Sequence, residues 1–164
     1  MAIKLFITGG TIDNIDKDRK LKSRKTHIPK MLKQANVTLE INTEKLMLKD
    51  SRDLTDSDRK LILKKCKQCR EDKIIITHGT FTMAKTAAIL GQGIKNKTIV
   101  LTGSMVPYVE DNSDALFNLG CAISKVQTIP RGIYITMNGQ ILKWGNVKKN
   151  VKKGIFEEIN NKRK

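Results

Sequence analysis

Hydroxyl side chains follow the predicted buried strands of this 164-residue chain at four places, namely Thr11, Ser51, Thr80 and Ser104. If these strands are adjacent and parallel, the turns after them meet in one crevice at the carboxyl edge of the sheet. A hydroxyl nucleophile needs a base or a lowered proton affinity, and backbone N–H groups in glycine-rich turns can stabilise an oxyanion. Hydroxyls grouped in this way suit acyl transfer on a small polar substrate.

The stretch from Ile74 to Met83 gives the strongest of these signals. Ile74, Ile75 and Ile76 predict a strand that is buried on both faces. A polar turn, Thr77–Thr82, and a helix-compatible run from Met83 follow it. The turn thus lies where open α/β sheets bind their ligands.

The first predicted strand, 3–8, ends in Gly9 and Gly10, directly before Thr11. Two glycines allow a tight turn and the close approach of another group to the backbone. Alone, this pattern is equally typical of an ordinary turn between a strand and a helix. The charged segment 13–25 that follows predicts a polar loop, which is either a lid over the site or a solvated surface loop.

Strands and helices alternate along the rest of the chain. We expect further strands at 37–41, 74–77, 97–102 and 132–137, and helices at 28–35, 83–90 and 114–126, with another helix beginning after an N-cap at Thr55. Asn138-Gly139 predicts a hairpin turn into a short return strand, 140–143. This order predicts an α/β fold: three layers, with a mainly parallel Rossmann/flavodoxin-like sheet and helices on both faces.

The length is sufficient for one domain, which we expect to span residues 1–164. From about residue 150 to 164 we expect a basic polar tail, with Phe156 and Ile159 as its apolar anchors. No apolar run approaches the roughly 20 residues of a membrane span, so we expect no membrane association and a cytoplasmic location.

The formal charge of +16, from 32 Lys and Arg against 16 Asp and Glu, would suit a polyanionic partner. The lysines are spread along the chain, and no zinc-finger, RRM or KH pattern occurs, so we expect no nucleic-acid function. The three cysteines give no disulfide framework, and Cys66-x-x-Cys69 has no further metal ligands nearby. Without a dinucleotide or Walker motif, we expect neither a cofactor nor a metal.

Four segments in order resemble the signatures of the bacterial-type L-asparaginase (asparaginase/glutaminase) family. They are Ile7-Thr8-Gly9-Gly10-Thr11-Ile12, Lys49-Asp50-Ser51-Arg52-Asp53, Ile76-Thr77-His78-Gly79-Thr80-Phe81-Thr82-Met83 and Leu101-Thr102-Gly103-Ser104-Met105-Val106-Pro107. The resemblance covers nearly the whole chain but only the N-terminal domain of the family.

The resemblance implies a two-step hydrolysis of the side-chain amide of asparagine or a related small amide, with a threonine nucleophile. It places the nucleophile at Thr11 and assigns proton transfer or water activation to Thr80. A lysine in a late basic turn would lower the proton affinity of Thr80, and the best local match is Lys149. Such a role is physically reasonable, because a nearby cation stabilises a developing alkoxide.

The resemblance also implies a substrate-binding set. The turn at Ser51 would hold the α-carboxylate of the substrate, and backbone groups near Gly79 and Ser104 would line its amide end. The residues that we assign to substrate binding are Gly10, Ser51, Arg52, Gly79, Phe81 and Ser104.

The chain departs from the family pattern at the site itself. Phe81 stands where the family has an aspartate that holds the α-amino group of the substrate. Losing such a charged contact would cost about 2–5 kcal/mol, so we expect weak activity. The loop after Thr11 lacks the tyrosine that the family has there. Arg52 and Val106 also stand where the family usually has other residues. The resemblance does not include the C-terminal domain of the family.

Two functions from different classes follow. The first is an asparaginase-like amidohydrolase with reduced activity or an altered substrate. The second is a catalytically impaired homologue that binds a small ligand or a protein through the same crevice. In either case we expect a homo-oligomer, a dimer, because family members assemble and a lone N-terminal domain would expose its interface.

Overall fold

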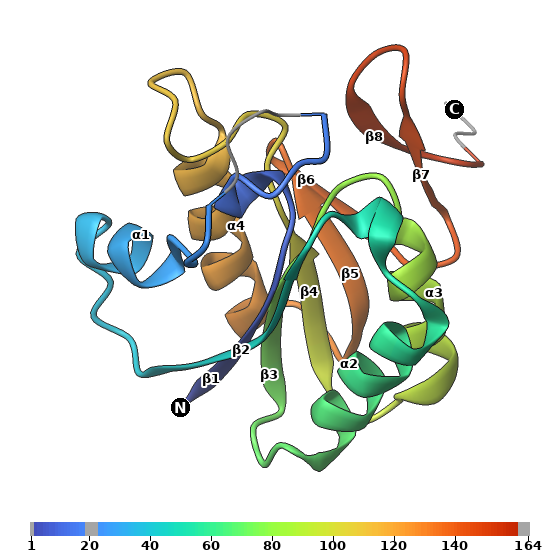
Figure 1. The fold of residues 1–164 in the computed structure, drawn as a ribbon. Coiled ribbons are helices and arrows are strands. Elements are labelled where there is room, and N and C mark those ends of the chain that lie inside the picture. Colours follow the sequence, from blue (N-terminus) through green and yellow to red (C-terminus); the bar gives the residue numbers. More distant parts are fainter. Residues whose placement is uncertain (1, 19–22, 161–164) are drawn as a thin grey trace.

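A six-stranded sheet forms the centre of the computed structural model, which describes residues 2–18 and 23–160 (Figure 1). The strand order is β2-β1-β3-β4-β5-β6. The first five strands pair in parallel, and β6 runs antiparallel to β5. The strands are β1 (Ile3–Gly9), β2 (Ile41–Lys49), β3 (Lys73–Thr77), β4 (Thr98–Thr102), β5 (Gly132–Met137) and β6 (Gln140–Lys143).

Helices cover both faces of the sheet (Figure 1). Helices α1 (Ile28–Gln34) and α4 (Ala115–Thr128) lie on one face, and α2 (Asp56–Gln68) and α3 (Met83–Gly93) lie on the other. The three-layer α/β fold with a mainly parallel sheet is therefore confirmed. The return strand after Asn138-Gly139 is confirmed as β6.

The alternation of side chains along β1 shows how the strands fill both layers. Ile3, Leu5 and Ile7 pack into the cluster beneath α1 and α4, whereas Phe6 packs into the cluster beneath α2 and α3. Successive side chains of a strand point to opposite faces, so a run of apolar residues supplies both cores. The four buried residues thus fix β1 in the middle of the molecule.

The strand order places the functional edge of the sheet. Chain connections leave β1 toward β2 on one side and reach β3 on the other, which makes the space between β1 and β3 the switch point of the topology. In open parallel sheets, ligands bind at such a point, beyond the carboxyl ends of the strands. Thr11 follows β1 there, and Thr80 follows β3.

Helix α2 begins where the sequence predicts, with Thr55 as its N-cap. Thr55 Oγ1 accepts a hydrogen bond from the Asp58 backbone N–H at 3.1 Å, and the Asp58 carboxylate accepts one from the Thr55 N–H at 2.8 Å. This reciprocal capping box satisfies two backbone donors that the first turn of a helix leaves free.

The predicted second strand is wrong in its bounds. Residues 37–41 alternate in polarity, but β2 begins only at Ile41 and runs to Lys49. Its register is set by pairing with β1, from Ile3 beside Ile41 to Gly9 beside Lys49. Because β2 is an edge strand that remains partly exposed, it can carry polar residues that hide the strand pattern.

The segment after residue 146 forms a second, two-stranded sheet. Its strands β7 (Val147–Asn150) and β8 (Ile155–Glu158) pair in antiparallel fashion, so part of the expected basic tail is a folded hairpin. Phe156 is buried in the core as an anchor, but the prediction for Ile159 is wrong, because Ile159 is 52% exposed. Residues 161–164 lie outside the described part of the chain.

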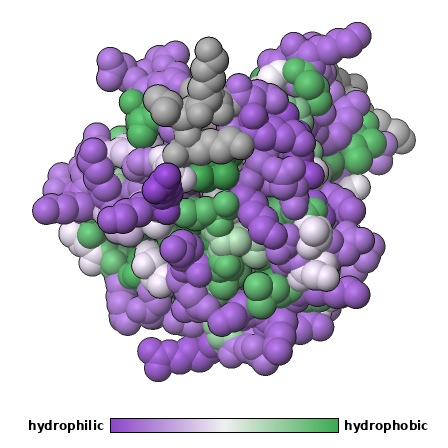
Figure 2. Space-filling view, viewed as in Figure 1, coloured by the Kyte–Doolittle hydropathy of each residue, from purple (hydrophilic) through white to green (hydrophobic). Residues whose placement is uncertain are grey.

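Hydrophilic side chains cover most of the face in Figure 2, with a strip of apolar side chains over the edge of the sheet that β2 forms. Leu46, Met47 and Leu48 on β2 are only partly buried. Within residues 2–18 and 23–160, no helix has the length and apolar character needed to cross a membrane.

Candidate active site

Three turns meet in close contact at the carboxyl edge of the sheet. Gly10 has a φ of 86°, and a Cβ atom placed on it would lie 2.4 Å from the backbone of Gly79. A Cβ atom on Gly79 would in turn lie 2.8 Å from the side chain of Ser51. Glycine is therefore required at both positions, because any side chain would force the turns apart. The contacts join the turns after β1, β2 and β3 into one unit.

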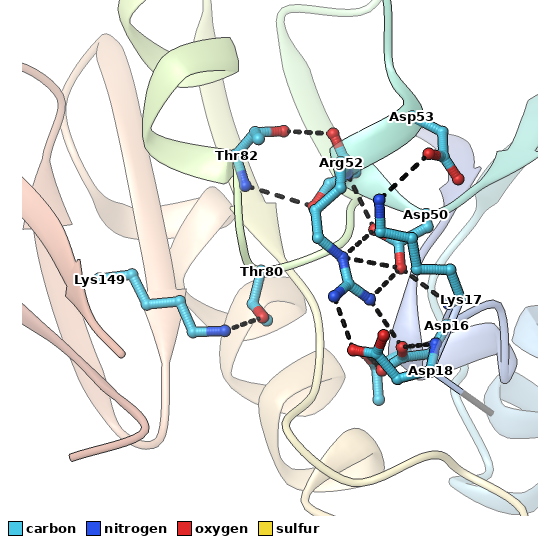
Figure 3. Close-up of polar contacts among 11 residues, drawn as sticks. Asp16, Lys17, Asp18, Asp50, Arg52, Asp53, Thr80, Thr82 and Lys149 are labelled. Carbon is cyan, nitrogen blue, oxygen red and sulfur yellow. Dashed lines mark hydrogen bonds and ion pairs between the residues drawn. The ribbon is translucent and has the colours of Figure 1, made fainter. Parts of the chain in front are cut away.

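The hydroxyls of Thr11 and Thr80 lie on two of these turns. Thr11 begins a short 3-10 helix, Thr11–Asp13, and is 8% exposed, while Thr80 is 4% exposed. Thr11 Oγ1 donates to the Asp16 carboxylate at 3.4 Å. Thr80 Oγ1 accepts from Lys149 Nζ at 2.7 Å, which leaves the hydroxyl proton of Thr80 free to point elsewhere (Figure 3).

Lys149 reaches the site from β7, outside the main sheet (Figure 3). Val147 and Phe156 anchor its hairpin in the core beneath α2 and α3. Burial lowers the pKa of Lys149 from its usual value of 10.5, and the positive charge of Arg52 lowers it further. A partly desolvated ammonium beside a hydroxyl favours a proton leaving that hydroxyl.

Arg52 is held by three carboxylates, as Figure 3 shows. Its guanidinium lies 2.8 Å from Asp16, 2.6 Å from Asp18 and 2.6 Å from Asp50. Burial of Asp50 opposes its ionisation, but hydrogen bonds from Arg52 and from two backbone N–H groups lower its pKa to about 2. We call this group the Arg52 clamp; its members are Arg52, Asp16, Asp18 and Asp50. The clamp joins the loop after Thr11 to the turn after β2.

The ring of Phe81 contacts two cations and remains 42% exposed. Its ring centre is 4.4 Å from the Arg52 Cζ atom and 3.7 Å from Lys149 Nζ. Both cations are attracted by the electron-rich ring, and such contacts are each worth about 0.5–2 kcal/mol. The residue that departs from the family pattern thus has a defined packing role at the site.

Ser51 and Ser104 differ in their contacts with the rest of the site. Ser51 Oγ accepts from the Thr82 N–H at 3.3 Å, and the Ser51 carbonyl accepts from Thr82 Oγ1 at 2.7 Å. The Ser104 side chain is fully buried, and no hydrogen-bond partner for its hydroxyl is found in residues 2–18 and 23–160. Its turn adjoins the site through Gly103, where a Cβ atom would lie 2.4 Å from the His78 carbonyl.

His78 supports the turn that carries Thr80. Nδ1 donates to the Gly79 carbonyl at 2.7 Å, so Nε2 accepts from Thr86 Oγ1 at 2.8 Å. Complete burial lowers the pKa of His78 to about 4, despite the opposing hydrogen bond to Gly79. A neutral imidazole with both nitrogens engaged cannot also contact a substrate, so its role is to hold the backbone.

The structure brings together most of the residues that the sequence predicts for the site. Contacts between neighbours link Gly10, Gly79 and Ser51, and separately link Arg52, Phe81, Lys149 and Thr80. Asp16 also lies in the site, although the sequence suggests only a polar loop there. An acid five residues after the proposed nucleophile is the one signal that could have indicated it. Within the described ranges, no group of metal-ligating side chains is present.

Comparison with known proteins gives consistent matches. The family model described as asparaginase, N-terminal, matches residues 2–160. An L-asparaginase from Thermococcus kodakarensis is 42% identical over 93 residues, which are 54% of this chain and 28% of the relative. L-asparaginase 2 from Escherichia coli is 29% identical over 160 residues, which are 90% of this chain and 46% of the relative.

Solved structures agree with the sequence matches. The thermostable L-asparaginase from Thermococcus kodakarensis superposes with a TM-score of 0.87 at 31% identity, covering 98% of this chain and 52% of that one. A probable cytoplasmic L-asparaginase from Campylobacter jejuni gives a TM-score of 0.76 at 31% identity, covering 90% and 49%. The chain thus spans about half the length of these structures, and it belongs to the asparaginase family, whose N-terminal domain it matches.

Proposed function

We propose that this chain is an amidohydrolase that releases ammonia from the side-chain amide of asparagine or a related small amide, with Thr11 as nucleophile. One observation carries the proposal above the others. Lys149 Nζ lies 2.7 Å from Thr80 Oγ1 at the switch point of the sheet, where Thr11 also lies. Acyl transfer requires a nucleophilic hydroxyl and groups that activate it or stabilise developing charge. This edge of the sheet provides a cation, a buried hydroxyl and a second hydroxyl.

In the first step, Thr11 Oγ1 attacks the amide carbon and ammonia leaves, which produces an acyl-enzyme. In the second step, water attacks the ester carbon, and Thr11 is regenerated with release of a carboxylic acid. The Lys149 ammonium stabilises alkoxide character on Thr80, so Thr80 can take a proton from the attacking water while it passes its own proton to the leaving Thr11 Oγ1. Ser51 and the backbone of the nested turns would hold the substrate.

The test is ammonia release from asparagine and from glutamine by the purified chain. Thr11→Ala should lower turnover by about a thousandfold or more, because the acyl-enzyme can no longer form. A wild-type rate equal to that of Thr11→Ala would contradict the proposal.

The second candidate is a homologue that binds a ligand without turning it over. The observation in its favour is Phe81, whose ring holds Arg52 and Lys149 and offers no carboxylate to a substrate ammonium. Binding of aspartate in calorimetry, combined with no ammonia release, would select this candidate. Assembly into a homodimer and a cytoplasmic location remain predictions from the sequence.

A further inference from the structure

The carboxylate of Asp16 lies beside the hydroxyl of Thr11, and its two oxygens have different partners. Oδ1 accepts from Arg52 Nη2 at 2.8 Å and from the Asp18 backbone N–H at 3.0 Å. Oδ2 accepts from Thr11 Oγ1 at 3.4 Å. One oxygen is therefore held by the protein, and the other faces the proposed nucleophile.

We propose that Asp16 is a catalytic residue, the general base that takes the proton of Thr11 as its hydroxyl attacks the amide; this rests on the function proposed above. A nucleophile, a base in contact with it and a third group that orients the base form the arrangement by which hydroxyls are activated in acyl transfer. Here these parts are Thr11, Asp16 and Arg52. The contact of 3.4 Å is long for a hydrogen bond, as is usual for catalytic contacts before substrate binds.

The Arg52 clamp keeps the base in one orientation. Arg52 also binds Asp50 and Asp18, and its guanidinium stacks on Phe81. Asp50 accepts a further hydrogen bond from the Lys17 N–H at 2.9 Å, next to Asp16 in the chain. Arg52 therefore holds the carboxylate of Asp16, and the Lys17–Asp50 hydrogen bond holds the backbone next to it. The Asp16 side chain is only 17% exposed.

The proton balance of the reaction closes with these groups. The proton passes from Thr11 Oγ1 to Asp16 Oδ2 while the bond between Oγ1 and the amide carbon forms. When the carbon–nitrogen bond breaks, the same proton passes to the nitrogen, which leaves as ammonia. Water then cleaves the acyl-enzyme, giving its hydroxyl group to the acyl carbon and its proton to Thr11 Oγ1.

Asp16 has one competing role, which is to bind an α-ammonium group on the substrate. The two roles make different demands on the substrate. A general base acts on every amide, whereas an ammonium partner matters only when the ammonium is present. Asparagine and succinamate, which differ only in the α-amino group, separate the two.

The first experiment follows acylation of Thr11 in the full chain by p-nitrophenyl acetate, read by intact mass. Asp16→Asn keeps an oxygen for the Arg52 contact but cannot take a proton, and it should slow labelling by about a hundredfold. The control is Asp56→Asn, which makes the same exchange at an acid outside the clamp, with a 75% exposed side chain that pairs with Lys85 at 3.2 Å. It should change labelling by less than about fivefold, as expected for an exposed ion pair.

The proposal is overturned if Asp16→Asn labels as fast as the wild type, or if Asp56→Asn is slowed equally. It also fails if the wild type labels no faster than Thr11→Ala. Because an activated ester needs no amide cleavage, this result is independent of whether ammonia is released.

The second experiment measures ammonia release from asparagine and succinamate. A general base predicts that Asp16→Asn lowers kcat/KM for both amides by the same factor, and a loss confined to asparagine would show ammonium binding instead. If the wild type releases no ammonia from either amide, the proposed function fails, while the labelling experiment still decides the role of Asp16.

Discussion

At the scale of single residues, the ring of Phe81 connects the two halves of the site. It contacts Arg52, which belongs to the loop-holding clamp, and Lys149, which contacts Thr80. A carboxylate at this position would form ion pairs with both cations instead. The aromatic ring leaves the charges of Arg52 for Asp16, Asp18 and Asp50, so it supports a carboxylate at a different place beside Thr11.

Lys149 gives a prediction with a matched control. Lys149→Met should lower turnover by about a hundredfold, because the variant removes the cation at Thr80. Lys148→Met changes the next residue of β7, whose ammonium pairs with Glu157 at 3.4 Å, and should have little effect. Steady-state ammonia release measures both, and equal losses in the two variants would contradict the assignment.

The pH dependence of turnover tests whether Lys149 acts in its charged form. If the charged ammonium is required, turnover falls as pH rises through the pKa of Lys149. Burial and Arg52 hold this pKa below the usual 10.5, so the loss should begin at a lower pH than for an ordinary lysine.

The sequence could predict the site residues that lie within short motifs. Thr11 and Thr80 each follow a predicted strand, so local pattern and fold class together indicate that they meet. Ser51 follows no strand at its predicted bounds, so only the family resemblance indicates its place in the site. Asp16 could not be found in this way, because an acid in a charged loop has no pattern of its own. Its role depends on Arg52, 36 residues away in the chain, and that contact forms only in the folded molecule.

At the scale of elements, the hairpin β7–β8 carries the proposed function of Lys149 without belonging to the main sheet. The sequence predicts a polar tail here because only Val147 and Phe156 are buried in the hairpin. Two such residues give no periodic signal. The predicted bounds of β2 are wrong for a related reason, because its pairing with β1 and not its own polarity sets where it begins and ends.

Phe156→Ala tests whether the β7–β8 hairpin can detach while the main sheet stays folded. Truncating a buried phenylalanine costs about 3–5 kcal/mol, which should detach the hairpin and withdraw Lys149 from Thr80. Hydrogen exchange should then accelerate in residues 147–158 while the amides of β1, β3 and β4 stay protected, and turnover should fall as in Lys149→Met.

Ile159→Ala is the control, because Ile159 is 52% exposed and should leave the hairpin protected. Loss of protection throughout the sheet in Phe156→Ala would show that the hairpin and the sheet unfold together.

At the scale of the whole molecule, acid should destabilise the fold through His78. Its pKa falls from 6.5 to about 4 on folding, so the unfolded chain binds the proton more readily. The stabilisation is complete above pH 6.5 and is lost as pH falls toward 4, by up to about 3 kcal/mol. Urea denaturation across this range should show the loss, and His78→Gln should flatten it. An unchanged slope in the variant would assign the effect to other groups.

Asp50 acts in the same direction at lower pH. Its folded pKa of about 2 lies below the usual 3.8, so its contribution is present above pH 3.8 and is lost as pH falls toward 2. Acid should therefore loosen the turn at Thr80 before it breaks the Arg52 clamp.

The close contacts among the turns after β1, β2 and β3 form the frame of the site, and the side chains that would act on a substrate project from this frame. The backbone of Gly79 lies against the backbone of Gly10 and against both the backbone and the side chain of Ser51. Side chains such as Phe81 and Asp16 stand on this frame, and exchanging them leaves these contacts in place. A chain built in this way can change its substrate, or lose its activity, by substitutions that leave its fold and its stability nearly intact.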